Sequence, residues 1–449
     1  MRKFFPFLLC AYGFSALPVA AQQSRLPAMV DQELSSLVAT YKSLHAAPEL
    51  SHHEDKTSAL LAERLRSLGF DVTDHLGKYP NPDWKGYGVV AVMKNGSGPT
   101  VLIRADMDAL PVEEKTGLPY ASKVHTQDDS GADVPVMHAC GHDVHVTSLL
   151  GTAKMLAGLK DQWRGTLILL GQPAEERIDG ARALLADGLY TRFPKPDYVI
   201  ALHDNADLEA GKIAFTSGYA LASATSVDVS IRGRSSHGSR PESSKDPIVM
   251  AAEYILAIQT IVSRERSPFD PAVVTVGSIH GGTKHNIIPD EVHLQLSIRT
   301  YKEEVRQQIL ASLDRIARGV AIASGVPEDR MPIVKASETE VTTAMYNDPA
   351  LTARVISTIQ RAIGKDNVVE RSPVMASEDF GYLGLENHQI PTMMFSLGAI
   401  DHDRITASQN PGAAPLPSLH SGLFYPTPEP TLRTGVIAMT AATLDLMKK

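Results

Sequence analysis

The sequence predicts an α/β protein in which a mostly parallel β-sheet forms a larger domain and a two-layer α+β domain is inserted into it. In the first half of the chain, short and continuously apolar segments alternate with helical segments, as in sheets covered on both faces. Near Gly218 the strands begin to alternate polar and apolar residues, as in a sheet with one solvated face. From about residue 334 the first pattern returns.

Length and composition are those of a globular protein with two or three domains. The chain has 449 residues, of which 43% are hydrophobic and 21% are charged, so it can bury a real core. Its formal net charge is −8, and it has no block of five or more Lys and Arg residues. Because nucleic-acid-binding proteins concentrate positive charge, we expect no nucleic-acid partner.

The N-terminal segment is typical of a secretory signal peptide. Two basic residues precede an apolar stretch at residues 4–20, and small residues follow where cleavage would occur. The alternative is a membrane anchor, but proline and glycine interrupt a stretch already short for crossing a bilayer. We therefore expect residues 1–21 to be removed and the mature protein to be periplasmic or secreted, without stable insertion in a membrane.

The larger domain is predicted from both ends of the remaining chain. In the first part we expect helices and strands in the order typical of a parallel sheet: helices at residues 27–46, 57–68 and 143–159, and strands at residues 88–93, 101–104, 166–170 and 198–202. In the last part we expect a helix at residues 349–363, a buried strand at residues 392–397 and a helix at residues 429–447.

The inserted domain has the order β-α-β-β-α. Its expected strands keep one polar face and lie at residues 226–231, 272–279 and 291–299, and its helices lie at residues 247–263 and 302–323. Such an order suits a sheet with helices on one side. The domain boundaries predicted from these patterns are residues 24–217 and 334–449 for the larger domain and 218–333 for the inserted one.

Polar side chains gather just beyond the predicted strands. Asp106 and Asp108 follow one strand, Glu175 and Glu176 follow another, and His203 follows a third. The segment HACGHD at residues 138–143 leads into a helix. Because ligands collect at the carboxyl ends of strands in an open parallel sheet, these side chains predict one shared site.

Cys140 and His142 flank a glycine, and this spacing lets both side chains turn toward one ion. Cys140 is the single cysteine outside the signal segment, so it has no internal disulfide partner. A free cysteine is often just a small buried hydrophobe. Beside imidazole and carboxylate groups, however, a thiolate forms a recognised ligand set for zinc and similar metals. His138 and His145 flank the same turn, and one interpretation is that they support these ligands.

Glu175 and Glu176 are adjacent and can take different roles. In extended backbone their side chains would point in opposite directions, so one could bind a metal while the other removes a proton from water. The alternative is a solvated pair of carboxylates in a loop.

Seven segments, in this order, resemble the M20 metallopeptidase family, and in particular its amidohydrolase branch of hippurate hydrolases, N-acyl-amino-acid deacylases and plant auxin-conjugate hydrolases. They are RADMDALP (104–111), HACGHD (138–143), QPAEE (172–176), SHGSRP (236–241), NIIPD (286–290), SEDF (377–380) and LH (419–420). The resemblance spans nearly all of the mature chain.

The resemblance implies a dinuclear metal site, with two divalent ions per subunit. The implied ligands are Cys140, His142, Glu176, His203 and His420, with Cys140 in the place of a bridging carboxylate. Glu175 would be the general base, and Asp108 would orient a ligand near the metals. Thiolate favours zinc, whereas metal supply can impose manganese, nickel or cobalt.

The inserted domain resembles the family's lid and dimerisation domain, which implies a possible homodimer. His237 matches a histidine that reaches the partner's site and polarises the scissile carbonyl, and the sequence leaves open whether it acts within one subunit or across two. Asn286 and Arg299 match binders of a substrate carboxylate, a group that the guanidinium fork suits. Asp106, where other branches have a metal-binding histidine, is assigned no role. The residues after His203 are more polar than is usual for the branch.

The expected activity is hydrolysis of the amide bond of an N-acyl or aminoacyl amino acid, such as a hippurate-like or N-acetyl amino acid. One alternative is a metallo-carboxypeptidase or dipeptidase that acts on short peptides with the same site. A second is a non-catalytic, metal-containing solute-binding protein.

Overall fold

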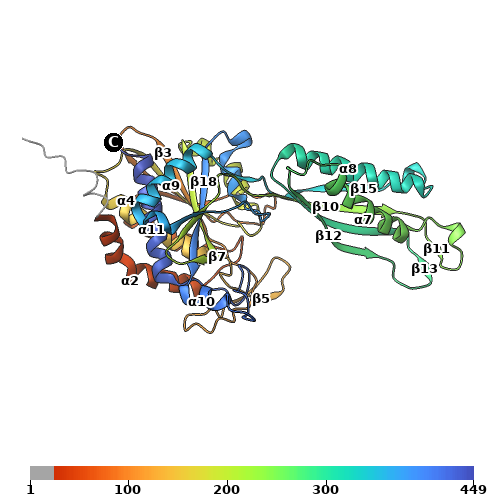
Figure 1. The fold of residues 1–449 in the computed structure, drawn as a ribbon, viewed down its shortest axis with the longest axis horizontal. Coiled ribbons are helices and arrows are strands. Elements are labelled where there is room, and N and C mark those ends of the chain that lie inside the picture. Colours follow the sequence, from red (N-terminus) through yellow and green to blue (C-terminus); the bar gives the residue numbers. More distant parts are fainter. Residues whose placement is uncertain (1–24) are drawn as a thin grey trace, which may run out of the picture.

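The computed structural model describes residues 25–449, and the expected signal peptide at residues 1–21 lies outside the described residues (Figure 1). An α/β lobe and an elongated inserted domain, here called the lid, extend away from each other (Figure 1). This arrangement confirms the predicted fold class.

An eight-stranded mixed sheet forms the centre of the α/β lobe, in the order β1-β2-β6-β3-β7-β18-β8-β17. Its central strands β6, β3, β7 and β18 are parallel to one another, while β1, β2 and β8 supply antiparallel pairings. The strand bounds are β1 Asp71–Leu76, β2 Gly88–Asn95, β3 Thr100–Asp106, β6 Gly165–Gln172, β7 Tyr198–Glu209, β8 Ile213–Phe215, β17 Val368–Glu370 and β18 Thr392–Ile400.

Both faces of this sheet are buried, because its side chains alternate between two cores. Ile103 packs into the core beneath five long helices, whereas Leu102 faces the core beneath two short ones. The long helices are α2 Arg25–His45, α3 Asp55–Ser67, α4 His142–Gly158, α9 Pro349–Ile363 and α11 Pro428–Leu446, and the short ones are α5 Gly180–Ala186 and α6 Leu189–Arg192. All the long helices were predicted to within two residues at each end.

The lid is a four-stranded antiparallel sheet in the order β12-β14-β10-β15. Two helices cover one of its faces, and the buried side chains of β10 and β14 alternate with polar ones on the other. The elements are β10 Ser223–Arg232, α7 Pro247–Arg264, β12 Ala272–Gly281, β14 Glu291–Thr300, α8 Glu303–Ala323 and β15 Ile333–Val341. The pairing of β15 with β10 extends the lid sheet to residue 341, beyond the boundary at 333 expected from the sequence.

A two-stranded ribbon forms the tip of the lid, at the end farthest from the α/β lobe (Figure 1). It pairs β11 Ser236–His237 with β13 Ile287–Ile288. The remaining elements are small, and most of them lie in the α/β lobe. They are β4 His125–Gln127, β5 Asp133–Pro135, β9 Gly218–Leu221, β16 Met345–Asn347 and α10 His402–Ser408, with short 3₁₀ helices that include Asp379–Gly384.

Candidate metal centre and active site

The candidate site lies where the parallel strands β3 and β6 end, beside the middle of β7, as expected for an open α/β sheet. Asp106 is the last residue of β3, and Glu175 lies three residues beyond β6. His203 belongs to β7, which continues past the site to Glu209. His142 begins α4, directly after the turn that holds Cys140.

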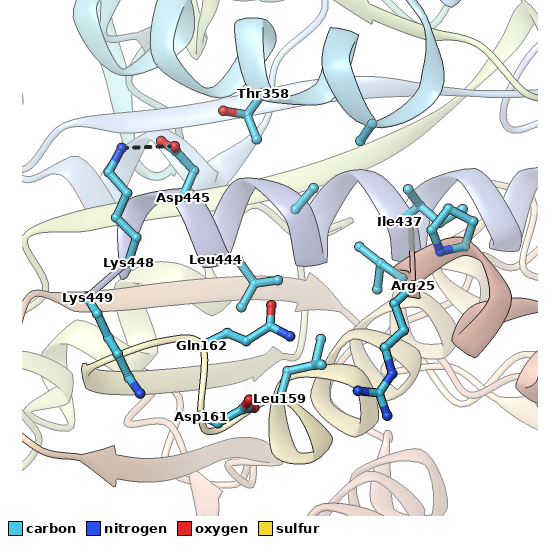
Figure 2. A pocket seen from close by; sticks show the side chains of 14 residues that line it. Arg25, Leu159, Asp161, Gln162, Thr358, Ile437, Leu444, Asp445, Lys448 and Lys449 are labelled. Carbon is cyan, nitrogen blue, oxygen red and sulfur yellow. Dashed lines mark hydrogen bonds and ion pairs between the residues drawn. The ribbon is translucent and has the colours of Figure 1, made fainter. Parts of the chain in front are cut away.

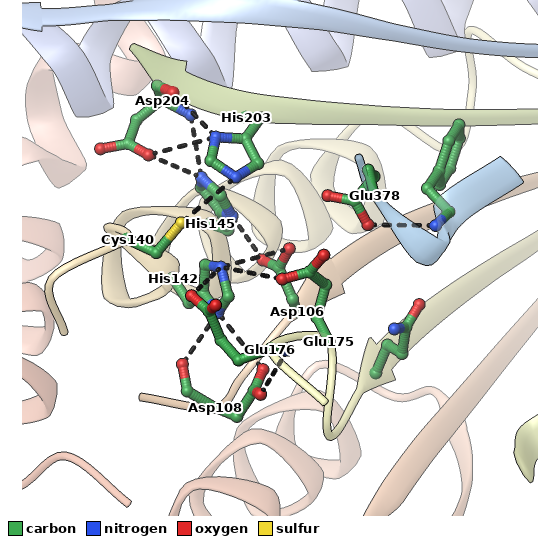
Figure 3. A network of polar contacts seen from close by, with 12 residues as sticks. Asp106, Asp108, Cys140, His142, His145, Glu175, Glu176, His203, Asp204 and Glu378 are labelled. Atoms are coloured by element: carbon green, nitrogen blue, oxygen red, sulfur yellow. Dashed lines mark hydrogen bonds and ion pairs between the residues drawn. The ribbon is translucent and has the colours of Figure 1, made fainter. Parts of the chain in front are cut away.

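The structure brings the five expected ligands together in two groups that share Cys140. Figure 3 labels four of them, Cys140, His142, Glu176 and His203. One group contains Cys140, His142 and His203, and the other contains Cys140, Glu176 and His420; within each, the possible ligand atoms lie within 4.8 Å of one another. Sγ of Cys140 lies 3.6 Å from Nε2 of His203. Two trios of N, S and O donors with one common member form the arrangement that two neighbouring cations need.

The chemistry of these donors fits cations. Nε2 of His142 and Oε1 of Glu176 are buried, and neither has a hydrogen-bond partner among the described residues. Burial and the Glu176 and Glu175 carboxylates raise the pKa of the Cys140 thiol, and burial raises the pKa of Glu176 to about 7. A bound cation would reverse both effects, because it stabilises thiolate and carboxylate. Buried, unpartnered donors surrounded by negative charge are therefore suited to hold metal.

Backbone carbonyl groups orient two of the histidines. Nδ1 of His142 donates to the carbonyl oxygen of Asp108 at 2.8 Å, and Nδ1 of His203 donates to the carbonyl oxygen of Asp204 at 2.8 Å. In the neutral form, a ring that donates through Nδ1 carries its lone pair on Nε2, the atom that metal binding requires.

Gly141 is required by close packing as well as by backbone conformation. Its φ is +80°, and a Cβ at this position would lie 2.1 Å from Oδ2 of Asp204. The turn between Cys140 and His142 can therefore close only over a glycine.

Asp108 positions other residues of the site. Its Oδ2 accepts hydrogen bonds from Oγ of Ser51 at 2.7 Å and from the backbone N–H of Glu176 at 2.9 Å. Its Oδ1 lies 3.3 Å from Nδ1 of His142. Through these contacts Asp108 holds the Glu176 backbone and lies beside the His142 ring, while the role expected for it stays a prediction.

The expectation that Glu175 and Glu176 point in opposite directions is wrong. Oε2 of Glu175 and Oε1 of Glu176 each lie 3.9 Å from Nε2 of His142. The reason is that residues 175–178 form a turn and not an extended strand. Ala174, just before this turn, and Ile178, its last residue, both have a φ of +51°. This backbone conformation is costly for residues with a Cβ. Glu175 is 6% exposed, and burial together with the Glu378 charge raises its pKa.

Sequence reasoning missed a buried ionic network beneath the site. Arg104, 1% exposed, donates to Asp106 at 2.5 Å, to Glu378 at 2.8 Å and to Asp379 at 3.2 Å. His145 joins Asp106 to Asp204, lying 3.2 Å from Oδ1 of Asp204. Arg104, Glu378 and Asp379 belong to segments that carried the family resemblance, which is the signal that could have found them.

Two expected site residues lie elsewhere in this chain. His237 and Asn286 belong to the exposed ribbon at the lid tip, where the N–H of Gly238 donates to the carbonyl oxygen of Asn286. The α/β lobe of the same chain is at the other end of the lid (Figure 1). In this structure His237 therefore lies away from the metal site of its own chain.

Arg299 does lie at the site. It extends from β14 into a cavity of about 630 Å³ that also contains Cys140, Glu175, Glu176, His203 and His420. Its guanidinium donates to Oγ of Ser377 at 2.6 Å. It has no ion pair with a carboxylate among the described residues, so its charge is available to a ligand.

A different pocket, of about 350 Å³, opens between α2, α4, α9 and α11 (Figure 2). Leu159, Ile437 and Leu444 line it, with Arg25 and Lys449 at the rim. It contains none of the expected ligands, so the chemistry belongs to the larger cavity.

Comparison with known proteins decides the family. The sequence model of peptidase family M20/M25/M40 matches residues 102–423, which include all five candidate ligands. The chain belongs to this family. It is an M20 hydrolase, as the resemblance implied.

Characterised relatives are similar over most of their length. The chain is 37% identical over 341 residues to a hippurate hydrolase of Campylobacter jejuni, covering 76% of this chain and 82% of that protein. It is 36% identical over 351 residues to an N-acetyl-L-cysteine deacetylase of Bacillus subtilis, with 77% of each protein covered. It is 36% identical over 360 residues to thermostable carboxypeptidase 2 of Saccharolobus solfataricus, covering 80% and 84%.

Solved M20 structures share the fold. An aminohydrolase structure from methicillin-resistant Staphylococcus aureus has a TM-score of 0.81 and 30% identity, covering 95% of this chain and all of that one. A dinuclear metal-binding M20 peptidase from Bacillus subtilis has a TM-score of 0.70 and 26% identity, covering 92% and 98%.

Proposed function

We propose that this M20 hydrolase is a dinuclear, metal-dependent amidohydrolase that releases an amino acid from an N-acyl or aminoacyl conjugate. The convergence of two donor trios on Cys140, with Glu175 beside them, carries the proposal. The hippurate hydrolase and the N-acetyl-L-cysteine deacetylase support this substrate class, since both names describe hydrolysis of an acylated amino acid.

Cys140, His142, Glu176, His203 and His420 would hold two divalent cations, zinc or manganese in the first place, with nickel or cobalt as alternatives. When bound, such cations lower the pKa of a water molecule and polarise a carbonyl group. Glu175 would accept the proton of the attacking water at its carboxylate and later donate it to the leaving nitrogen. Its burial serves this exchange, because a raised pKa lets the carboxyl group hold the proton between the two steps.

Arg299 would bind the carboxylate of the amino-acid part of the substrate. It lies in the same cavity as Glu175, and burial lowers its pKa without a carboxylate partner to offset that cost. A substrate carboxylate would provide this partner and could take both N–H groups of the guanidinium fork.

A homodimer formed through the lid would bring His237 and Asn286 to the partner's site. The outer face of α7 exposes Ile248, Val249, Leu256 and Val262, and β12 is an edge strand with one side unpaired. Within the described part of the chain, α7 is also long and apolar enough to cross a membrane, but its inner face packs into the lid core. We infer that a second copy of this chain covers the outer face, which would explain the apolar surface.

Export is part of the proposal. The basic, apolar and small-residue pattern of residues 1–21 supports a signal peptide and a periplasmic or secreted mature protein.

Replacing Glu175 tests the mechanism. Glu175→Ala should retain both metal ions and lose several orders of magnitude in kcat, because it removes the carboxylate assigned to carry the proton. Elemental analysis and hydrolysis of an N-acyl amino acid measure the two quantities. Turnover close to the native rate in the metal-loaded variant would contradict the assignment.

A substrate panel separates the alternatives. Hippurate, N-acetyl amino acids and dipeptides should be ranked by kcat/KM, and we expect the acylated amino acids to rank first. A preference for dipeptides would favour the carboxypeptidase alternative, which the Saccharolobus relative supports. Stoichiometric ligand binding without hydrolysis of any amide would favour a solute-binding protein.

A further inference from the structure

The catalytic cavity contains a second arginine. Arg371 lies in it together with Arg299, and its guanidinium donates to Oδ1 of Asp207 at 2.5 Å and contacts Oδ1 of Asn205 at 3.4 Å. The Arg371 side chain is 35% exposed and that of Asp207 is 71% exposed, so both charges remain accessible inside the cavity. The mechanism proposed above uses neither of them.

This charge pair is connected to the metal centre by a single strand. His203, Asn205 and Asp207 all belong to β7 and line the same cavity, together with the buried Asp204, whereas Ala206 and Leu208 pack into the protein. At a rise of about 3.3 Å per residue, Asp207 lies at most about 13 Å from His203 along the strand. The Arg371 guanidinium also contacts Asn205, which is only two residues from His203. A ligand that extends from the metal centre to Arg371 therefore has a shorter distance to bridge.

A second wall of the cavity connects the two arginines. From Arg371 the chain runs past β9, with the N–H of Val374 donating to the carbonyl oxygen of Ala220, and reaches Ser377, which contacts Arg299. Apolar side chains that line the cavity include Phe215, Leu221 and Met345. The cavity therefore contains a cationic group on β14, a separate charge pair at Arg371 and Asp207, and apolar side chains.

We propose that Asp207 and Arg371 form a distal subsite that recognises the amino-acid head of an acyl group, a zwitterion with an ammonium and a carboxylate on one carbon. This inference rests on the proposed function, since it takes Arg299 as the binder of the carboxylate on the leaving amino acid. The acyl group then extends in the opposite direction, toward Asp207. The preferred substrates would be isopeptide-like conjugates, in which a side-chain carboxyl group of one amino acid acylates another.

A zwitterion fits this subsite better than a simple anion. A lone carboxylate near Arg371 would compete with Asp207 and be repelled by its charge. A zwitterion can place its carboxylate on the free N–H groups of Arg371 and its ammonium on the free oxygen of Asp207. A neutral alkyl group would leave both charges without a partner and gain little there.

Four matched amides of alanine test the proposal with the metal-loaded protein. Their acyl groups are butanoyl, glutaryl, γ-glutamyl and the one-carbon-longer α-aminoadipoyl group joined through its δ-carboxyl. γ-Glutamyl differs from glutaryl only by the ammonium group. We expect kcat/KM for the better of the two zwitterionic amides to exceed that for glutaryl by about tenfold or more.

Two variants assign this preference to the charge pair. Asp207→Asn should lower the ratio of γ-glutamyl to glutaryl efficiency about tenfold, because it removes the carboxylate that the ammonium needs. Arg371→Gln should lower the ratio of each charged amide to butanoyl. Arg66→Gln is the matched control, since Arg66 and Asp74 form a comparable surface ion pair outside the cavity. Thermal unfolding of each variant checks that the fold is intact.

The outcomes distinguish the two proposals. If the native protein cleaves all four amides with efficiencies within threefold, or if the variants leave the ratios unchanged, the distal subsite is refuted and the amidohydrolase function stands. If the metal-loaded protein cleaves no amide of either panel, both proposals are overturned.

Discussion

At the scale of single residues, surroundings give the histidines near Cys140 different roles. His142 and His203 donate Nδ1 to backbone carbonyl groups and keep Nε2 for the site. His145 lies between two aspartates. Burial acts to lower its pKa, but the Asp106 charge outweighs this effect and the pKa is raised to about 9. Burial lowers the pKa of His138 to about 4. Residue type alone does not distinguish these cases, because each depends on burial and on the groups that surround the ring.

His45 provides a residue-scale prediction of pH dependence. It is 1% exposed, and its Nδ1 lies 2.7 Å from Asp143 while its Nε2 lies 3.2 Å from Glu114. Burial acts to lower its pKa, but these two carboxylates raise it to about 9 from 6.5. A raised folded-state pKa stabilises the protein below pH 6.5, and this contribution is lost as the pH rises through 9. Its full size is about 3 kcal/mol.

Denaturant unfolding between pH 6 and 9.5 tests this prediction. The native protein should lose stability across this range, and His45→Gln should lose less, so that the two curves converge at high pH. His402→Gln is the control, because His402 forms an exposed pair with Glu209. Parallel curves for the native protein and His45→Gln would show that His45 is not the titrating group.

At the scale of elements, α7 has more apolar surface than the lid alone can bury. Leu256 is 73% exposed at the middle of its outer face. Leu256→Glu should convert a dimer into a monomer, since a charge in an apolar interface has no partner there. Sedimentation or light scattering measures the mass. The control is Ile322→Glu, because Ile322 is also an exposed apolar residue, at 64%, but lies on α8 and not on α7. Equal masses of the native protein and Leu256→Glu would contradict the lid dimer.

The ribbon of β11 and β13 allows a separate test of where His237 acts. Co-expression of Glu175→Ala and His237→Ala subunits should restore activity that neither variant has alone. If His237 acts across subunits, each mixed dimer contains one complete site. Under random pairing, about half of the dimers are mixed and one of the two sites in each is complete. About a quarter of all sites are then active, which gives about a quarter of the native activity. Action within one subunit predicts no restoration.

At the scale of the whole molecule, the metal centre joins distant parts of the α/β lobe. Its donors come from the turn before α4, from β7, from the turn after β6 and from the segment before α11. Removal of metal should therefore lower Tm, since a ligand at a thousandfold excess over its Kd stabilises the folded state by about 4 kcal/mol. Differential scanning calorimetry before and after chelation measures the change, and added zinc or manganese should restore Tm. Elemental analysis must first show that the metal has been removed. If Tm is then unchanged, this structural role is refuted.

The sequence by itself determined the fold class and the order of the elements, and its resemblance to the family named the candidate donors. Sequence pattern predicts α2, α4 and β3 because each depends on the local arrangement of apolar residues along the chain. The pairing of β15 with β10 was not predicted, because register across the lid is set by contacts between residues about a hundred positions apart. The chain also contained Arg104, Glu378 and Asp379, but only folding shows that they share one buried charge network.

Only the tertiary structure decided the directions and distances. It placed Glu175 and Glu176 on the same side of His142, because their backbone turns and is not extended. It placed His237 at the far tip of the lid and Arg371 against Asp207 inside the cavity. Residue types, which can be read directly from the sequence, decide which reactions the side chains can support. The roles of those residues depend on which side chains meet in space, and that is settled when the strands pair and the layers pack.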